Sequence, residues 1–380
     1  MMPKKTMIKI VLARFILACL ALTLPSTLLA VTGGTIFVAA EGSDNVAVID
    51  ASTNTWITNI STGTGSIPHN PVVSPDNQYV YVTLRGTNQI AKISTVTNTL
   101  VATFSSYGAE PVHMDVSTDG SSLFVVNQKD DEVVKINTTS GALEATHSFA
   151  APGDNTTLNL IKPHDVNVGP DGNLWVTDEL QNTLSLVDAS LTGLVTTITV
   201  GDRPIQVAFS GSQAFTTNYN DNTVSVIDAG TYTVTDTFNM GGGGIMGPMG
   251  AVASPDGSKL WLSGTAGDTV HAHDLLGSPI GLSYTETNGL LGAHGLDISD
   301  DGKFLYTSVR YDNYSIGRDA IAVIDSSDGS VVTTFYTPGA TDLHGVAYVS
   351  AVPLPASIWL FVSGFFGLLG MARSKKNLTT

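Results

Sequence analysis

The sequence predicts an all-β fold, a seven-bladed β-propeller with four-stranded antiparallel blades. Three observations lead to this prediction: a tight-turn phrase that recurs along the chain, a second phrase that returns every 40 to 51 residues, and a C-terminal strand that matches the inner-strand phrase. Four short strands in a repeat of this length are the signature of a propeller. We assign residues 31–351 to it, between apolar segments at 1–30 and 352–380.

The first phrase is an apolar triplet, a tight turn and a β-rich run. Proline presets φ, Asp closes the turn through its side chain, and Gly or Asn accepts the left-handed exit. The copies are Ser74-Pro75-Asp76-Asn77, Ser117-Thr118-Asp119-Gly120, Gly169-Pro170-Asp171-Gly172, Ser254-Pro255-Asp256-Gly257, Ser299-Asp300-Asp301-Gly302 and a degenerate Ser210-Gly211-Ser212. Each copy is therefore expected to join two strands.

The second phrase closes the following strand. Its seven copies end at Asp50, Ser94, Asn137, Asp188, Asp228, Asp274 and Asp325. The first phrase has only six complete copies, so one blade lacks an inner strand. His344–Val349 matches that strand, whereas Thr35–Ala39 starts as the second strand of a blade. We therefore expect the C-terminal strand to complete the N-terminal blade and close the ring. Insertions at 153–160 and 311–318 are expected to be loops.

Several segments resemble the YVTN-type β-propeller repeat. They are Tyr81-Val82-Thr83, Val200-Gly201-Asp202-Arg203-Pro204 and Asn222-Thr223-Val224-Ser225-Val226-Ile227-Asp228. The resemblance covers nearly all of residues 35–350 and implies the WD40-like propeller fold. It says little about function, because the same repeat occurs in surface proteins, in lactonase relatives and in quinoprotein amine dehydrogenase-like domains.

Residues 1–30 have the layout of a secretory signal peptide. Basic residues precede an apolar run from Phe15 to Leu24, and a small-residue site predicts cleavage after Ala30. The expected partner is the Sec export machinery. An uncleaved anchor is the alternative, but the run is about half of the ~20 residues that span a bilayer. Removal of the peptide would also remove Cys19, the only cysteine.

The predicted body is strongly acidic. Four of the seventeen Lys and Arg lie in 1–30 and three lie after residue 351, and neither end contains an acid. The body therefore carries ten bases against 33 acids, a formal charge of about −23. Such a surface repels phosphate, which excludes nucleic acid as an expected partner.

Residues 352–380 have three parts in a fixed order. The motif Val352-Pro353-Leu354-Pro355-Ala356 precedes an apolar stretch at 357–372 and a basic end at 373–376. This order resembles the PEP-CTERM sorting signal of the VPLPA type. The resemblance implies a transient transmembrane helix, cleavage by an exosortase, and a Gram-negative bacterium with an extracellular polysaccharide matrix. The destination would be the outer surface, the matrix or the medium. A permanent C-terminal anchor is the alternative.

Histidines recur where the inner strands begin, at one mouth of the channel. His69, His164 and His294 each lie seven residues before the Asp of the following turn, and His344 has the same place in the closing blade. His113 is one residue further on. Gln206 and Met249 occupy comparable places in the other two blades.

Neutral imidazole is a good ligand for copper or zinc, and Met adds a soft ligand for copper. The predicted ring resembles the hub of nitrous-oxide-reductase-type propellers, although no cupredoxin-like domain follows. The alternative is structural: each His would bond the backbone of the neighbouring blade, or the side chains would lie too far apart to share an ion.

Other residues suggest less chemistry. His271 and His273 alternate on one strand, where a solvated pair is expected, and the run Gly241–Gly244 lacks the Lys and the setting of a phosphate loop. No nucleophile elbow is present. The sequence favours a binding or structural protein of the cell surface over an enzyme. Metal binding or redox chemistry at the hub and a lactonase-like hydrolase are the alternatives.

Overall fold

The computed structural model describes residues 33–149, 161–240, 247–265, 269–285, 292–310 and 319–351. The cleavage site at Ala30, the motif from Val352 to Ala356, the insertions at 153–160 and 311–318 and the run Gly241–Gly244 lie outside the described residues. Residues 33–352 form one compact unit. Among the described residues, no helix is long and apolar enough to cross a membrane.

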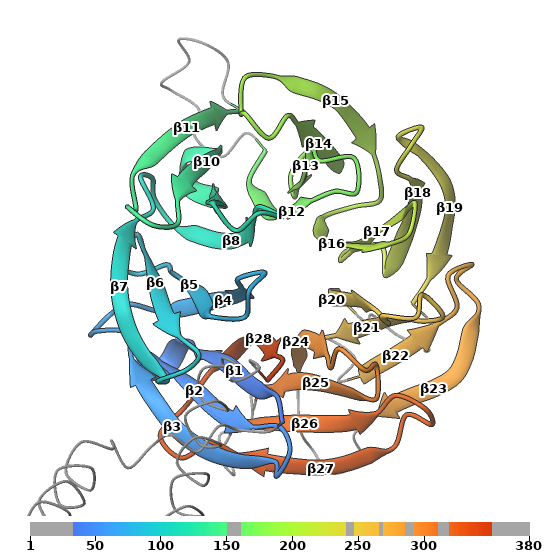
Figure 1. The fold of residues 1–380 in the computed structure, drawn as a ribbon. Coiled ribbons are helices and arrows are strands. Elements are labelled where there is room, and N and C mark those ends of the chain that lie inside the picture. Colours follow the sequence, from blue (N-terminus) through green and yellow to red (C-terminus); the bar gives the residue numbers. More distant parts are fainter. Residues whose placement is uncertain are drawn as a thin grey trace, which may run out of the picture. The chain divides into compact units, whose positions relative to one another are not determined.

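Seven four-stranded antiparallel sheets surround a central channel (Figure 1). The first four blades, from inner to outer strand, are β28 (Leu343–Val349), β1 (Thr35–Ala40), β2 (Asn45–Asp50) and β3 (Thr55–Ser61); β4 (Pro68–Val73), β5 (Tyr79–Leu84), β6 (Gln89–Ser94) and β7 (Thr99–Ser105); β8 (Pro111–Val116), β9 (Ser122–Asn127), β10 (Glu132–Asn137) and β11 (Leu143–Ser148); and β12 (Pro163–Val168), β13 (Leu174–Asp178), β14 (Thr183–Val187) and β15 (Leu194–Thr199).

The remaining blades follow the same order. They are β16 (Pro204–Ser210), β17 (Gln213–Asn218), β18 (Thr223–Asp228) and β19 (Thr233–Asn239); β20 (Pro248–Ala253), β21 (Leu260–Gly264), β22 (Thr269–His273) and β23 (Pro279–Thr285); and β24 (Ala293–Ile298), β25 (Phe304–Val309), β26 (Ala320–Asp325) and β27 (Val331–Tyr336). Two 3-10 turns, η1 (Glu41–Ser43) and η2 (Gln128–Asp130), join second to third strands.

The predicted closure of the ring is confirmed. β28 pairs antiparallel with β1, with Thr35 opposite Val349 and Val38 opposite Val346. The last described strand therefore serves as the inner strand of the first blade. The edge of β1 is therefore not left open, where it would invite pairing with another chain.

The hydrophobic core lies between adjacent blades. Side chains of the first blade, such as Phe37 and Val48, pack with Val80, Val82 and Ile93 of the second. The second strand of the first blade, β1, is buried on both faces, whereas six of the seven residues of its outer strand β3 are exposed or half-buried. Each blade thus depends on both neighbours for burial of its apolar surface.

The predicted turns are present at the ends of the inner strands. In the second blade, Ser74 N–H donates to Tyr79 O over 2.9 Å, and Ser74 Oγ donates to Asp76 Oδ1 over 2.6 Å. Asn77 leaves the turn with φ of 57°, the left-handed conformation that Asn and Gly tolerate. The turn chemistry was therefore readable from the sequence.

Hydroxyl groups hold the inner strands to one another at the hub. Thr83 Oγ1 accepts from Asn70 N in its own blade and donates to Val112 O in the next blade, over 3.0 and 2.7 Å. The same bridging position is occupied in five of the seven blades, by Thr83, Thr177, Thr217, Ser263 and Ser308. These side chains satisfy polar backbone groups that face the channel rather than another strand.

The closure makes a testable prediction. A chain that ends at residue 342 lacks β28 and leaves an open edge on β1, so we expect it to aggregate or lose cooperative thermal unfolding. A chain that ends at 352 should keep the native transition. Size-exclusion chromatography and circular dichroism measure both. A permuted chain that places 342–351 before residue 33 through a two-residue turn should fold again; failure of this chain alone would show that β28 needs more than its pairing with β1.

A second prediction concerns Asp178, at the end of β13. Burial raises the pKa of this carboxyl to about 7, although the Thr183 and Ser185 hydroxyls donate to it. Because the folded state binds the proton more tightly, the free energy of unfolding should fall as pH rises from about 4 to 7. The fifth blade has Asn218 at the same place, bonded to Thr223 and Ser225.

Asp178→Asn should therefore stabilise the protein by ~1–4 kcal/mol at pH 8, change little at pH 4 and flatten the slope between them. Denaturant unfolding at several pH values measures this. Burial also raises the pKa of Asp115 and Asp297 to about 6, so part of the slope should persist in the variant. An equal gain at pH 4 and pH 8 would contradict the assignment to ionisation.

Candidate metal centre

Five buried histidines meet in the channel at one end of the inner strands. The chain of neighbouring rings runs His294, His344, His69, His113, His164, with centroid separations of 3.7, 3.7, 5.5 and 4.6 Å. Each residue is at most 9% exposed. The predicted order around the hub is confirmed, and the rings are close enough for several of them to share one ion.

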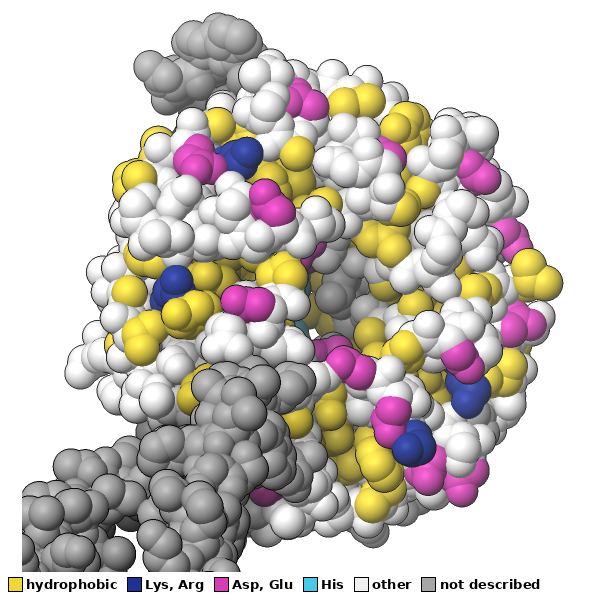
Figure 2. Space-filling view, viewed as in Figure 1, with side chains coloured by type: hydrophobic (Ala, Val, Ile, Leu, Met, Phe, Trp, Pro, Cys, Tyr) yellow, Lys and Arg dark blue, Asp and Glu magenta, His cyan; other side chains and the backbone are white. Residues whose placement is uncertain are grey.

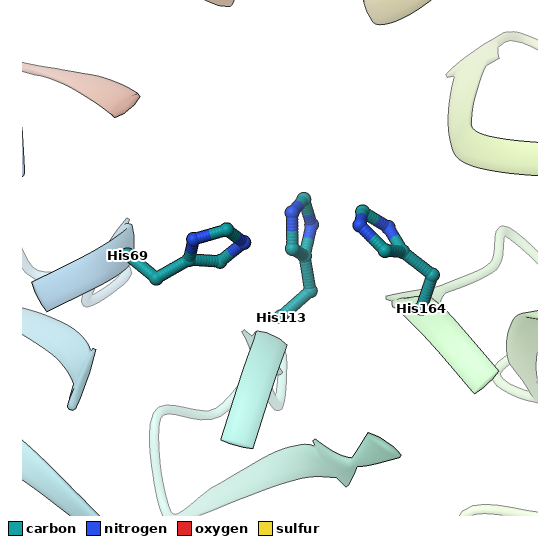
Figure 3. A group of neighbouring side chains, drawn as sticks. All are labelled: His69, His113 and His164. Atoms are coloured by element: carbon teal, nitrogen blue, oxygen red, sulfur yellow. The ribbon is translucent and has the colours of Figure 1, made fainter. Parts of the chain in front are cut away.

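Three of these side chains form a compact ligand set (Figure 3). The rings of His69, His113 and His164 converge from β4, β8 and β12, and one ring nitrogen from each lies within 4.8 Å of the other two. An ion bound at the usual zinc–nitrogen distance needs nitrogens about 3.3 Å apart. Rotation of the side chains that moves each nitrogen by about an ångström would bring the three nitrogens to that separation.

An oxygen atom fixes the orientation of each ring. Nδ1 of His69 lies 2.5 Å from Glu41 Oε1, Nδ1 of His113 lies 2.9 Å from Asp165 Oδ1, and Nδ1 of His164 lies 3.1 Å from the carbonyl oxygen of Ile205. Carboxylate and carbonyl oxygens accept, so Nδ1 carries the proton and Nε2 keeps its lone pair. Metal-binding histidines are oriented in this way by their outer-shell partners.

The free lone pairs face into the hub. Nε2 of His69 is buried and has no hydrogen-bond partner among the described residues. In Figure 3 this nitrogen points toward His113. A buried nitrogen without a partner is costly in a protein interior, and a metal ion would satisfy it.

The electrostatics of the hub favour neutral imidazoles. Burial, followed by the other histidines and Arg85, holds the pKa of His69 well below its usual value. Burial and His113 lower the pKa of His164 to about 3. Burial also holds the pKa of His294 and of His344 well below the usual value. Neutral imidazole is the form that binds metals, so ligation at neutral pH displaces no proton from these Nε2 atoms.

The structural alternative for the histidines holds for His164 alone, whose Nδ1 bonds the backbone of the next blade. The Thr and Ser hydroxyls described above perform that task at most hub positions. Gln206 also has a structural role, because its Oε1 accepts from Ala251 N over 2.9 Å. Met249 lines the hub cavity of about 170 Å³ together with His113, His164, His294 and His344.

Glu41 is a site residue that the sequence did not reveal. It is 11% exposed and follows β1 directly, the place that Arg85 holds after β5 and Arg310 after β25. Arg85 lies 3.6 Å from Glu41 and 2.5 Å from Glu110. Aligning the residues that follow the second strand of each blade would have shown that Glu41, Arg85 and Arg310 occupy equivalent positions. Glu41, Arg85 and Glu110 line an adjoining cleft of about 520 Å³.

The expectation of a solvated pair at His271 and His273 is wrong. His273 is completely buried, and its two ring nitrogens lie 3.1 and 2.9 Å from the carbonyl oxygens of Gly277 and Met240. Nε2 of His271 is buried as well. Both residues belong to β22, the third strand of its blade, which the fourth strand and the neighbouring blade cover.

Acidic side chains are spread over the outer surface, as Figure 2 shows around the hollow of the channel. They do not form one patch on this face. Among the described residues, the two groups of potential metal ligands are His69, His113 and His164, and Glu41, His69 and His344, all at the hub.

Comparison with known proteins supports the fold. The model of the family described as "Lactonase, 7-bladed beta-propeller" matches residues 29–160, about a third of the chain. A putative 6-phosphogluconolactonase from Bacteroides fragilis is similar with a TM-score of 0.67 and 18% identity, covering 86% of this chain and 100% of that one. None of the curated proteins matches this sequence.

Two further solved structures share the architecture. A functionally unknown protein from Desulfotomaculum acetoxidans has a TM-score of 0.65 and 18% identity, covering 83% of this chain and 99% of that one. Virginiamycin B lyase from Staphylococcus aureus has a TM-score of 0.61 and 13% identity, covering 73% and 92%. At these identities the similarity establishes the fold alone.

Proposed function

We propose that the protein binds a zinc or copper ion in the hub through Nε2 of His69, His113 and His164. The observation that carries this proposal is the shared orientation of the three rings: each Nδ1 meets an oxygen acceptor, which leaves three Nε2 lone pairs for one ion. Three neutral imidazoles suit either metal. Met249, which lines the same cavity as His113 and His164, adds a soft donor that favours copper.

The metal content of the full-length chain tests this proposal. The chain, purified without a histidine tag and dialysed, should retain zinc or copper in elemental analysis. Asp165→Asn removes an outer-shell partner and should weaken metal binding by the typical tenfold to hundredfold. His164→Ala removes a ligand and should weaken metal binding by more than that. His147→Ala, on the outer strand β11, is the matched control and should leave affinity unchanged. A metal-free, folded wild-type chain that takes up neither ion would refute the hub site.

We further propose that the hub is exported and displayed. The support is the sequence of the two ends: residues 1–30 have the layout of a signal peptide with a cleavage site after Ala30, and Val352–Ala356 resembles a sorting motif. The acidic body suits an extracellular, polysaccharide-rich setting, where self-repulsion maintains solubility. The intact mass of the chain recovered from a Gram-negative host reports whether residues 1–30 have been removed; retention of both ends would contradict this part.

Lactone hydrolysis is a second candidate activity. The specific support is the lactonase model match at 29–160, which includes His69 and His113 but ends before His164. Three imidazole ligands with one open position are the arrangement in which zinc lowers the pKa of water to about 7, which permits ester cleavage near neutral pH. The cleft beside Glu41 offers room for a small ring.

Lactone opening is measured by proton release with γ- and δ-lactones. We expect the metal-loaded chain to exceed the metal-free chain, and we expect His164→Ala to fall to the metal-free rate while His147→Ala keeps the full rate. Equal rates with and without metal would exclude a hub-dependent hydrolase and would leave the metal-binding proposal intact.

A further inference from the structure

We propose that the hub holds a second metal ion, bound by Glu41, His69 and His344 and sharing His69 with the first. This inference rests on the proposed function for the shared ligand. One ligand atom from each of these three residues lies within 4.8 Å of the other two. Their side chains are almost fully buried: Glu41 is 11% exposed, His69 3% and His344 6%. They come from η1, β4 and β28.

The two ring nitrogens of His69 serve different ligand groups. Nε2 points toward His113 and has no partner among the described residues, whereas Nδ1 contacts the Glu41 carboxylate. One imidazole can therefore bind an ion on each side. Occupation of the second site displaces the Nδ1 proton, which leaves to solvent, and the resulting imidazolate bridges the two ions. The ring of His344 is tilted by 35° against that of His69, with the two centroids 3.7 Å apart, and it supplies the third ligand.

The surroundings predict unequal affinities. Arg85 lies 3.6 Å from Glu41, and Arg310 is paired with Asp342 beside the same mouth. These cations repel a second ion and compete for the Glu41 carboxylate. Among the described residues, no arginine forms an ion pair or hydrogen bond with the inner set, His69, His113 and His164. The second ion should therefore bind more weakly than the first, and it should face the cleft that Glu41, Arg85 and Asp342 line.

Titration of the full-length, metal-stripped chain with Cu²⁺ tests the proposal. Equilibrium dialysis should give two ions per chain, a tight one and a weaker one. His344 lies outside the inner set, so His344→Ala should reduce the number of bound ions to one without changing the affinity for the tightly bound ion. Glu41→Gln should also reduce it to one. Asp165→Asn should keep two ions, with the tight ion bound tenfold to hundredfold more weakly, and His147→Ala on the outer strand β11 is the matched control.

Electron paramagnetic resonance gives an independent measurement on the same samples. Two bridged Cu²⁺ ions couple, so the doubly loaded chain should show less signal than two isolated spins, whereas His344→Ala should show one full spin. His147→Ala should retain both ions, and circular dichroism verifies that each variant is folded.

The outcomes separate the two proposals. A wild-type chain that binds one ion, or two ions retained in both His344→Ala and Glu41→Gln, would overturn the second site while leaving the first. A chain that binds neither Cu²⁺ nor Zn²⁺ in the hub would overturn both.

Discussion

Polar satisfaction of the hub backbone is the constraint on which the site depends. Inner strands pair with one strand of their own blade, so their other edge faces the channel and needs partners. Thr83, Thr177, Thr217, Ser263 and Ser308 meet that need by accepting from their own inner strand and donating to the next blade. Because short hydroxyls perform this task, most of the larger imidazoles are free to project into the channel.

This arrangement explains how a protein of formal charge −16 can keep its ligands neutral. The acids are spread over the outer surface, whereas burial and mutual repulsion hold the pKa of His69, His164, His294 and His344 low. Two carboxylates at the hub, Glu41 and Asp165, each meet a particular ring. The interblade core fixes these positions, because neither neighbour of a blade can shift without opening apolar contacts.

The repeat made the fold predictable, because strand periodicity and turn chemistry are local and recur seven times. It also placed His69, His164, His294 and His344 together, since equivalent positions on inner strands must meet at the hub. Glu41 was missed because its role arises from a loop that bends over the neighbouring blade, and spacing along one strand carries no such information. His273 was misjudged because period-two alternation assigns a face but does not say what covers it.

Anomalous diffraction from crystals of the metal-loaded full-length chain tests the central claim most directly. The account predicts the strongest peak among Nε2 of His69, His113 and His164, about 2.0–2.3 Å from each nitrogen after small ring rotations. A strongest peak among the acidic side chains of the outer surface, with the three rings unchanged, would show that the hub histidines do not form the metal centre.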